Sequence, residues 1–254
     1  MHVYLAALNN QWIDNSLPTD AGIDKKDINS LITFVQLRSD KKLAEEIKYF
    51  KRFMLDSGAF TFVSDAKKAV DWNDYLNDYA DFINKYDIDL FFELDIDKLV
   101  GLEEVERMRA RLERLTGKKP IPVWHHWRGK QYLVDMCRNY PYVAYGAFIT
   151  DGLTKQYSHG MVPWAIQVAH EHGSKIHGLG FTSFDKLREF HFDSVDSSSW
   201  LAGQQYGYIA QFVPQIGKIK HINRPAGKKL QTYKVSRHNF GEWAKFAMWA
   251  ENNL

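Results

Sequence analysis

The fold is decided by residues 90–126, which read LFFELDIDKLVGLEEVERMRARLERLTGKKPIPVWHH. The first six residues form a nearly continuous apolar run, as expected of a strand buried on both faces of a parallel sheet. Residues 101–117 place apolar side chains at helical spacing with charges on the opposite face, and Gly117 is a typical helix stop. Apolar residues return at 121–126. The stretch therefore predicts two parallel strands joined by a helix.

The same alternation runs along most of the chain. Eight apolar segments are expected to be strands: 2–8, 31–37, 53–56, 90–95, 121–126, 142–148, 175–181 and 192–197. Helical patterns separate most of them, at 42–51, 71–86, 101–117 and 159–173, whereas residues 9–30 hold little helical pattern. No linker rich in Gly, Pro or Ser interrupts the alternation. The sequence therefore predicts an α/β fold, a single (β/α)8 TIM barrel that spans residues 1–254.

The C-terminal part of the chain is strongly basic. Residues 1–196 contain 25 Lys and Arg against 29 Asp and Glu, whereas residues 197–254 contain 8 against 2. We expect residues 201–237 to be an insertion near the top of the barrel and residues 240–254 to be a closing amphipathic helix. The basic segment, about 201–240, is typical of a surface that faces a polyanion. Its candidate nucleic-acid contacts are Lys218, Lys220, Arg224, Lys228, Lys229, Lys234 and Arg237.

Composition excludes several classes of protein. A hydrophobic content of 45% with 15% aromatic residues is ample for a packed core. The single cysteine, Cys137, excludes an intrachain disulfide framework and a cysteine-based zinc site. No apolar run approaches the roughly 20 residues that span a bilayer, and no secretory signal is evident. We therefore expect a cytoplasmic protein that does not enter a membrane.

Acidic residues gather at the predicted ends of the strands. In TIM barrels the active site lies at the C-terminal ends of the strands, and buried carboxylates are costly unless they are paired or used. Asp56 could alternatively cap a turn through Ser57 and Gly58, and Asp95 could cap the following helix. The candidate residues at these ends are Asp56, Asp95, His125, Gly146, Ala147, Gly180 and Asp196.

Two carboxylates across a pocket suit glycosidic chemistry, in which one attacks the anomeric carbon and the other moves a proton. No Walker pattern supports phosphoryl transfer. The adjacent residues His125 and His126 would point to opposite faces of a strand, which disfavours a shared metal. We therefore expect neither a catalytic metal nor a cofactor.

Four motifs, in chain order, resemble those of the tRNA-guanine transglycosylase family and of its phage relatives that insert 7-deazaguanines into DNA. LDSGAF at 55–60 is similar to the family's Leu-Asp-Ser-Gly-Gly-Phe, and FELD at 92–95 is similar to its strand-four aspartate segment. YVAYGAF at 142–148 is similar to its Gly-Gly-Leu-Ala-Val-Gly strand. HGLGFTSFDKLREFHFDSVDSSSW at 177–200 resembles the family's Met-Gly-Val-Gly-Thr-Pro, helix and Met-Phe-Asp-Cys-Val segments.

The resemblance implies a role for each matching residue. Asp196 would attack the sugar and form a covalent ester, and Asp56 would be the general acid or base. Asp95 would bind the Watson–Crick edge of the base. The remaining substrate-binding candidates are Ser57, Gly58, His125, Gly146, Ala147 and Gly180. The implied partners are DNA or tRNA and a free 7-deazaguanine base.

Departures from the family favour DNA over tRNA. The family's tRNA enzymes have a zinc site made by three Cys and one His, which a chain with Cys137 alone cannot build. The segment after Asp196 is SSSW rather than Leu-Pro-Thr-Arg. Two other interpretations stay open: a retaining glycoside hydrolase or nucleosidase that uses the same carboxylates, and a non-catalytic barrel that binds nucleic acid. The sequence leaves open which base is inserted and the oligomeric state.

Overall fold

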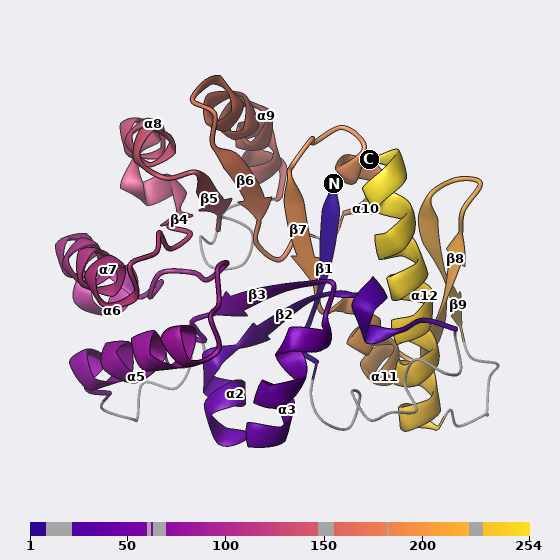
Figure 1. Cartoon of the computed structure of the whole chain (residues 1–254). Helices are drawn as coiled ribbons and strands as arrows, with labels where there is room; N and C mark the ends of the chain where they lie inside the picture. Colours follow the sequence, from indigo (N-terminus) through magenta and orange to yellow (C-terminus); the bar gives the residue numbers. More distant parts are fainter. Residues whose placement is uncertain (9–21, 60–61, 63–69, 147–154, 182, 224–230) are drawn as a thin grey trace. The chain divides into compact units, whose positions relative to one another are not determined.

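The computed structural model of the 254-residue chain describes residues 1–8, 22–59, 62, 70–146, 155–181, 183–223 and 231–254 (Figure 1). Among these residues, seven strands belong to one sheet, and two more form a separate hairpin. The seven strands are separated along the chain by helices, so the fold is α/β. The chain packs as two compact units. Unit 1 contains Met1–Leu31, Lys42–Phe53 and Gly180–Leu254, and unit 2 contains Ile32–Lys41 and Met54–Leu179.

In unit 1, strand β1 (His2–Ala6) lies between β2 (Asn29–Thr33) and β7 (Ser194–Ser197) and is parallel to both. Leu5 of β1 is opposite Ser30 of β2, and Tyr4 is opposite Asp196 of β7. Every residue of β1 after His2 is buried, as its apolar run predicts. Asp196 therefore lies beside β1, near the C-terminal end of the buried strand β7.

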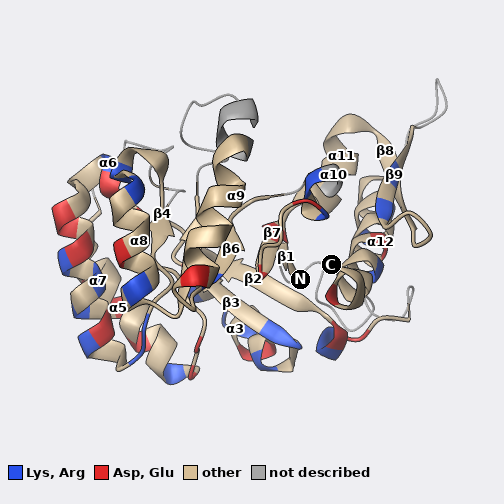
Figure 2. Ribbon diagram, turned by 90° about the horizontal axis from the view of Figure 1, so that it is seen from above, with Lys and Arg blue, Asp and Glu red and all other residues tan. Residues whose placement is uncertain are grey.

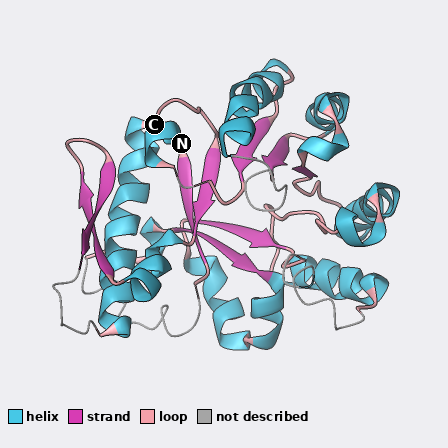
Figure 3. Cartoon of the chain, turned by 180° about the vertical axis from the view of Figure 1, so that it is seen from behind, coloured by secondary structure: helices cyan, strands magenta, loops and turns pink. Residues whose placement is uncertain are grey.

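The C-terminal part of unit 1 is a hairpin packed on a long helix. Strands β8 (Tyr208–Val213) and β9 (Lys218–Asn223) are antiparallel, and α12 (Thr232–Asn253) lies beside them (Figure 3). Side-chain oxygens of Asn239 and Glu242 in α12 accept hydrogen bonds from the backbone amides of Ala210 and Phe212, both at 2.7 Å. Helix α12 therefore bonds amides on the edge of β8 that faces away from β9.

Near the end of α12, Glu251 joins the helix to the preceding segments of unit 1. Its carboxylate accepts hydrogen bonds from Asn29 and Arg52 at 2.8 Å each and from Lys51 at 2.5 Å. Only 12% of its side chain is exposed. The other helices of this unit are short: α3 (Lys41–Glu46, in unit 1 from Lys42), α10 (Phe184–Leu187) and α11 (Ala202–Tyr206).

Unit 2 contains parallel extended segments in chain order. Leu55 of β3 (Arg52–Asp56) bridges Phe91, and Phe92 bridges Ile121, just before β4 (Val123–Trp124). Strand β5 (Tyr142–Tyr145) then lies between β4 and β6 (Lys175–Gly178). All of these pairings are parallel, so their C-terminal ends point the same way.

The helices of unit 2 have local sequence signals at their ends. Asp71 caps α5 by accepting hydrogen bonds from the amides of Asn73 and Asp74. Gly117 ends α7 with φ of +67°, in the left-handed region that favours glycine. The helices of this unit are α2 (Phe34–Ser39), α5 (Trp72–Lys85), α6 (Asp97–Val100), α7 (Leu102–Thr116), α8 (Lys130–Asn139) and α9 (Lys155–Glu171).

The α/β class is confirmed, whereas a full eight-stranded barrel is not confirmed within the described residues. The expected strand 31–37 is wrong after Thr33, because the Thr33 side chain accepts a hydrogen bond from the Gln36 amide and caps α2. The expected strand 90–95 is reduced to single bridges at Phe91 and Phe92. The closing helix begins at Thr232 rather than at residue 240.

Candidate functional site

Asp56 ends β3 and holds the turn that follows it. Its Oδ1 atom accepts a hydrogen bond from the Gly58 amide at 3.2 Å, which is the geometry of an Asx turn. Ser57 is buried, and its carbonyl oxygen accepts a hydrogen bond from the Tyr75 hydroxyl at 2.5 Å. Burial raises the pKa of Tyr79, and the nearby charge of Asp56 adds to the rise. Asp56 therefore shapes this turn, and it is a carboxylate among largely buried neighbours.

Gly58 keeps the turn after Asp56 narrow. Its φ is +72°, and a Cβ at this position would lie 2.6 Å from Cγ2 of Val35 in α2. Both observations exclude a larger residue without local rearrangement. Glycine at position 58 therefore reflects its backbone conformation and close packing against α2.

Asp196 lies in β7 of unit 1, and its side chain is largely buried. One carboxylate oxygen accepts a hydrogen bond from the backbone amide of Gly180 at 2.6 Å. Gly180 itself has φ of +70°. Just after β7, the Trp200 indole donates to the carbonyl oxygen of Ala6 at 2.8 Å, which ties the segment to β1. The carboxylate is thus held by a backbone donor, an arrangement that fixes its orientation.

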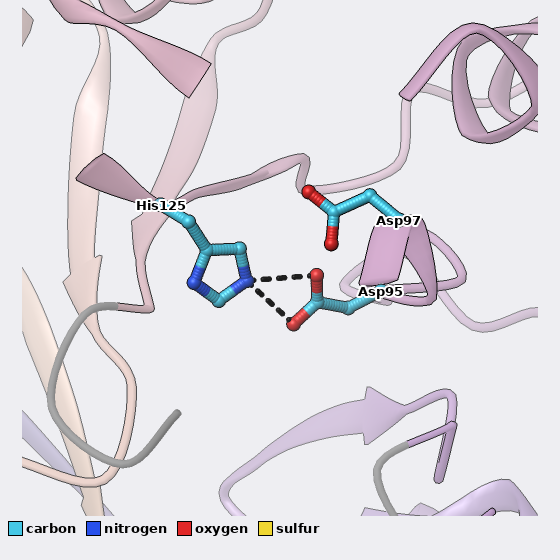
Figure 4. Close-up of side chains that lie close together, drawn as sticks. All are labelled: Asp95, Asp97 and His125. Carbon is cyan, nitrogen blue, oxygen red and sulfur yellow. Dashed lines mark hydrogen bonds and ion pairs between the residues drawn. The ribbon is translucent and has the colours of Figure 1, made fainter. Parts of the chain in front are cut away.

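In unit 2, Asp95 and His125 form a hydrogen-bonded pair (Figure 4). Nε2 of His125 lies 2.9 Å from Oδ1 and 3.0 Å from Oδ2 of Asp95, so it donates to both oxygens. The His125 ring also stacks on Trp127, with 4.4 Å between ring centroids and 6° between the planes. His125 is buried, and Asp95 is partly exposed.

A buried group of charges lies behind this pair. Glu93 accepts hydrogen bonds from Arg109 at 3.0 Å, from Arg128 at 2.9 Å and from the Val123 amide at 2.9 Å. Burial lowers the pKa of the Arg128 guanidinium, but Glu93, Asp95 and neighbouring carboxylates outweigh this effect and raise it above its usual range. Both arginines are therefore fixed positive charges next to the strand ends.

Asp97 completes the group through Arg128 and Trp127. Its Oδ2 atom accepts hydrogen bonds from Nε of Arg128 and Nε1 of Trp127, both at 2.8 Å. Burial alone would raise the pKa of Asp97, but the charge and hydrogen bond of Arg128, with the bond from Trp127, hold it below its usual value. Asp97 is therefore held as a carboxylate by these two donors.

Asp95, Asp97 and His125 could also offer three ligand atoms to a metal ion, all within 4.8 Å of one another. However, Arg128 contacts both carboxylates, and His125 points its Nε2 atom at Asp95. A cation among them would be repelled by the guanidinium, which already supplies the positive charge. The donor set therefore fits an ion-pair network better than a metal centre.

The glycine at the end of β5 is required by its neighbours. A Cβ at Gly146 would lie 2.6 Å from Cγ1 of Val123 and 2.7 Å from Cε1 of His125. The Gly146 amide donates to the carbonyl oxygen of Trp124 at 2.9 Å, which continues the β4–β5 pairing. Ala147, which we also expected to contact substrate, lies outside the described residues.

The basic candidates lie in the C-terminal part of unit 1. Lys218 and Lys220 are in β9, where Figure 2 shows basic residues in blue. Lys234 and Arg237 are in the first turns of α12. The candidates Arg224, Lys228 and Lys229 fall outside the described residues. In the part of the chain that the structure describes, no helix is both long and apolar enough to cross a bilayer.

The expected site residues divide between the two units. Asp196 and Gly180 are in unit 1, whereas Asp56, Ser57, Gly58, Asp95, His125 and Gly146 are in unit 2. Sequence reasoning missed Arg109 and Arg128. Arg109 offered a signal, because it shares the buried face of α7 with Val105, Met108 and Leu112. A lone arginine on an apolar helix face predicts a buried acidic partner.

Comparison with known proteins bears on the fold. No protein-family model and no curated protein matches the chain. Among solved structures, the chain is similar to a protein from Coccidioides immitis that is provisionally assigned as a fructose-1,6-biphosphate aldolase. The two share 11% identity and a TM-score of 0.51, over 99% of this chain and 87% of the other. At this identity the likeness shows the fold alone, and the chain is therefore an α/β protein of the TIM-barrel-like kind.

Proposed function

We propose that the chain is a base-exchange transglycosylase that replaces guanine in a nucleic acid, DNA in preference to tRNA, by a 7-deazaguanine. The observation that carries the proposal is the Asp196 carboxylate, largely buried at the end of a parallel strand and oriented by the Gly180 amide. The hydrogen bond from the Gly180 amide restricts the orientation of this carboxylate. A carboxylate held in this way suits nucleophilic attack on an anomeric carbon.

The proposed reaction is a double displacement. A carboxylate oxygen of Asp196 forms a bond to C1′ as the bond from C1′ to N9 of guanine breaks, and the leaving guanine takes a proton from a general acid. The incoming 7-deazaguanine then gives a proton to the conjugate base and attacks C1′, which releases Asp196. Two displacements retain the configuration at C1′, and the ester keeps the sugar in place between them.

Asp56 is the proposed acid and base in these steps. It ends a strand, as Asp196 does, and its partners hold it in one position while part of its side chain remains exposed. Asp95, His125 and the backbone at Gly146 are the proposed base-recognition residues, because they surround the ends of neighbouring parallel segments in unit 2. These roles rest on the resemblance of the motifs together with this local geometry.

The basic surface on β9 and α12 supports a nucleic-acid substrate. Lys220 is exposed, and Lys218 lies two residues before it on the same face of β9. Phosphate neutralisation by such residues would give sequence-independent affinity that falls with salt. A hydrolase acting on a small soluble glycoside would not need this surface.

The test is incorporation of labelled guanine, and separately of a labelled 7-deazaguanine, into DNA and into tRNA. Wild type is compared with Asp196→Asn and with Glu189→Gln, a control that removes an exposed charge from the same unit. Label that enters one polymer with wild type and the control, but not with Asp196→Asn, supports base exchange and selects the substrate. Release of free base without incorporation would instead indicate a hydrolase, and no reaction with either polymer would overturn the proposal.

The ester can be sought directly. Wild type incubated with guanine-containing DNA and then denatured should yield a protein–DNA adduct that Asp196→Asn does not form. Addition of excess free base before denaturation should remove the adduct, because the second displacement regenerates the enzyme. An adduct that persists in Asp196→Asn would assign the nucleophile to another residue.

A further inference from the structure

Trp127 is a large aromatic residue that remains partly at the surface of unit 2, with 38% of it exposed. It lies in the short 3₁₀ helix His126–Arg128, which follows the C-terminal end of β4. His125 and Arg128, which are close to it in the chain, are both buried. The indole is therefore an exposed ring beside the strand ends at which we place base recognition.

The plane of the Trp127 ring is fixed by its neighbours. Its Nε1 atom donates a hydrogen bond to Oδ2 of Asp97 at 2.8 Å. The His125 ring stacks on it with 6° between the planes, and the His126 ring meets it edge-on at 5.5 Å between centroids. An exposed ring that is already held in one orientation loses little freedom when a ligand stacks on it. Trp127 is therefore pre-organised for a flat ligand.

The ammonium of Lys98 covers the Trp127 ring. Nζ of Lys98, in α6, lies 4.1 Å from the ring centroid. Lys98 is exposed whereas His125 is buried, so the ammonium covers the side of the ring that faces solvent. An exposed cation–π contact contributes less free energy than a nucleobase stacked on an aromatic ring. A base can therefore take the place of the ammonium, which then becomes available to a neighbouring phosphate.

The exposed charges that accompany Trp127 are positive. Lys98 belongs to α6, and Lys130 is the first residue of α8, three positions after Trp127. Both lysines are exposed. The acidic neighbour Asp97 has only 6% of its side chain exposed and is bonded to Arg128. An exposed aromatic ring accompanied by lysines suits a single-stranded nucleic acid, whose bases stack and whose phosphates need positive charge.

We propose that Trp127 is a stacking platform for an unpaired base next to the exchanged one, and that Lys98 moves from the ring to a phosphate when this base binds. The choice of a nucleic acid as ligand rests on the proposed function. The platform rests on the exposure and the fixed plane of the ring. Stacking uses the face of a base, whereas the proposed role of Asp95 concerns the edge of the exchanged base, so the two contacts are separate.

The experiment compares two single-stranded DNA oligomers of equal length by fluorescence anisotropy. One contains only thymine, and the other has the same backbone without bases. Because both have the same phosphates, the ratio of their dissociation constants reports stacking and not charge. Thymine also lacks the guanine edge. Wild type should prefer the oligomer with bases by at least about 10-fold, and Trp127→Leu should reduce this preference about 10-fold, as expected for one stacked base.

Trp127→Phe separates stacking from the hydrogen bond to Asp97. Phenylalanine keeps an aromatic face but has no N–H group, whereas leucine has neither. Trp127→Phe should therefore retain most of the preference for bases. If Trp127→Phe and Trp127→Leu lose the preference equally, Trp127 acts through Asp97 and the platform is overturned.

Lys98→Gln tests the movement of the ammonium. Loss of one phosphate contact should reduce the slope of log affinity against log salt by about 0.7, the value for one charge on a single strand. The preference for bases should persist, because the ring is unchanged. An unchanged slope would overturn the role of Lys98.

Tyr49→Leu and Lys48→Gln are the matched controls. Nζ of Lys48 lies 5.1 Å from the Tyr49 ring centroid, and Tyr49 is 54% exposed, so the pair resembles Lys98 and Trp127. The control pair precedes the N-terminal end of β3, whereas Trp127 follows the C-terminal end of a strand. Neither control should change the ratio or the slope. If Tyr49→Leu reduces the preference as much as Trp127→Leu does, any exposed aromatic ring suffices and the proposal is wrong.

Failure of the platform and failure of the proposed function give different results. If Trp127→Leu keeps the preference of the wild type while label still enters DNA or tRNA, the platform alone is overturned. If the variants show the expected pattern of binding but label enters neither polymer, the platform is supported and the base-exchange activity is not. The binding measurement needs no turnover, so the two outcomes remain separate.

Discussion

Asp196 and Gly180 are joined by a hydrogen bond of 2.6 Å from the backbone amide to the carboxylate. The contact links the end of β7 to the segment that follows β6, where Gly180 adopts a φ of +70°. An asparagine oxygen could still accept from the same amide, whereas an alanine could not. The proposed nucleophilic role of Asp196 and its local hydrogen bond can therefore be separated by substitution.

We expect Asp196→Asn and Asp196→Ala to lose base exchange equally but to differ in stability. Asn should cost about 1 kcal/mol, because a charged acceptor is replaced by a neutral one, and Ala about 1–3 kcal/mol, because it strands the amide. Urea unfolding followed by circular dichroism checks the difference. Equal stabilities would mean that water replaces the carboxylate without loss.

Glu93→Gln should be among the most destabilising single changes in unit 2. The substitution keeps the shape of the side chain but leaves the buried guanidiniums of Arg109 and Arg128 short of a countercharge, a situation that costs about 3–5 kcal/mol. Glu104→Gln is the control, since it breaks a solvent-screened pair with Arg107 that should contribute far less. Chemical unfolding of both variants measures the contrast, and similar losses would contradict it.

Glu251 should contribute stability that depends on pH. Burial would raise the pKa of its carboxyl, but hydrogen bonds from Lys51 and Asn29, with the charges of Lys51 and Arg52, hold it below the ordinary value of 4.5. A pKa lowered by folding adds stability that is complete above 4.5 and is lost as the pH falls through the folded-state value.

Wild type should therefore exceed Glu251→Gln in unfolding free energy by about 1–2 kcal/mol at pH 7. The difference should shrink as the pH falls below about 4.5. Thermal or urea unfolding of both proteins from about pH 2.5 to about pH 7, a range in which carboxyl groups titrate, measures this difference in unfolding free energy. A difference that stays constant with pH would show that the charge of Glu251 does not cause the difference in stability.

Gly58→Ala should cost more than a substitution at an open glycine of the same backbone conformation. At Gly58 the new methyl would meet Val35 at 2.6 Å, whereas a Cβ at Gly117, with φ of +67°, would have nothing within 4 Å. Gly117→Ala should cost about 1 kcal/mol from the backbone alone, and Gly58→Ala about 1–3 kcal/mol more from overpacking. Val35→Ala in the Gly58→Ala background should recover part of the excess, which unfolding measurements would show.

If β9 binds nucleic acid, Lys218→Gln with Lys220→Gln should lower DNA affinity and its dependence on salt. Removal of two phosphate contacts should reduce the slope of log affinity against log salt by about 2. Lys41→Gln with Lys42→Gln is the matched control, because both lysines are exposed at the start of α3 and lie outside the basic segment of the sequence. Fluorescence anisotropy at several salt concentrations distinguishes the pairs, and equal slopes for all proteins would remove β9 from the interface.

Sequence patterns predicted the α/β alternation because they depend on local spacing. The helix over 101–117 appears as α7, which Gly117 ends, since both the apolar periodicity and the stop act within a few residues. The strand at 31–37 failed at Thr33 because an apolar run of this length fits a strand and a buried helix equally well. The hydrogen bond by which Thr33 caps α2 favours the helix, and the apolar pattern alone does not indicate this bond.

The candidate site was predictable in its carboxylates but not in their partners. Asp56 ends β3 and Asp196 lies in β7, within strands expected from the sequence, whereas Asp95 follows a segment that is reduced to single bridges at Phe91 and Phe92. The bond between Asp95 and His125 joins residues 30 apart, and the bond between Glu93 and Arg128 joins residues 35 apart. Such pairings depend on the register of neighbouring strands, which a single sequence does not specify.

The contacts of α12 with β8 also bear on how this chain avoids self-association. A strand edge with open amides is a template on which another chain can pair and begin to aggregate. Asn239 and Glu242 bond the amides of Ala210 and Phe212, so an incoming strand would have to displace these two side chains first. On the other strand, Lys218 and Lys220 add charges of the kind that discourage edge-to-edge pairing. The hairpin can thus remain at the surface of unit 1 without becoming a site of fibril growth.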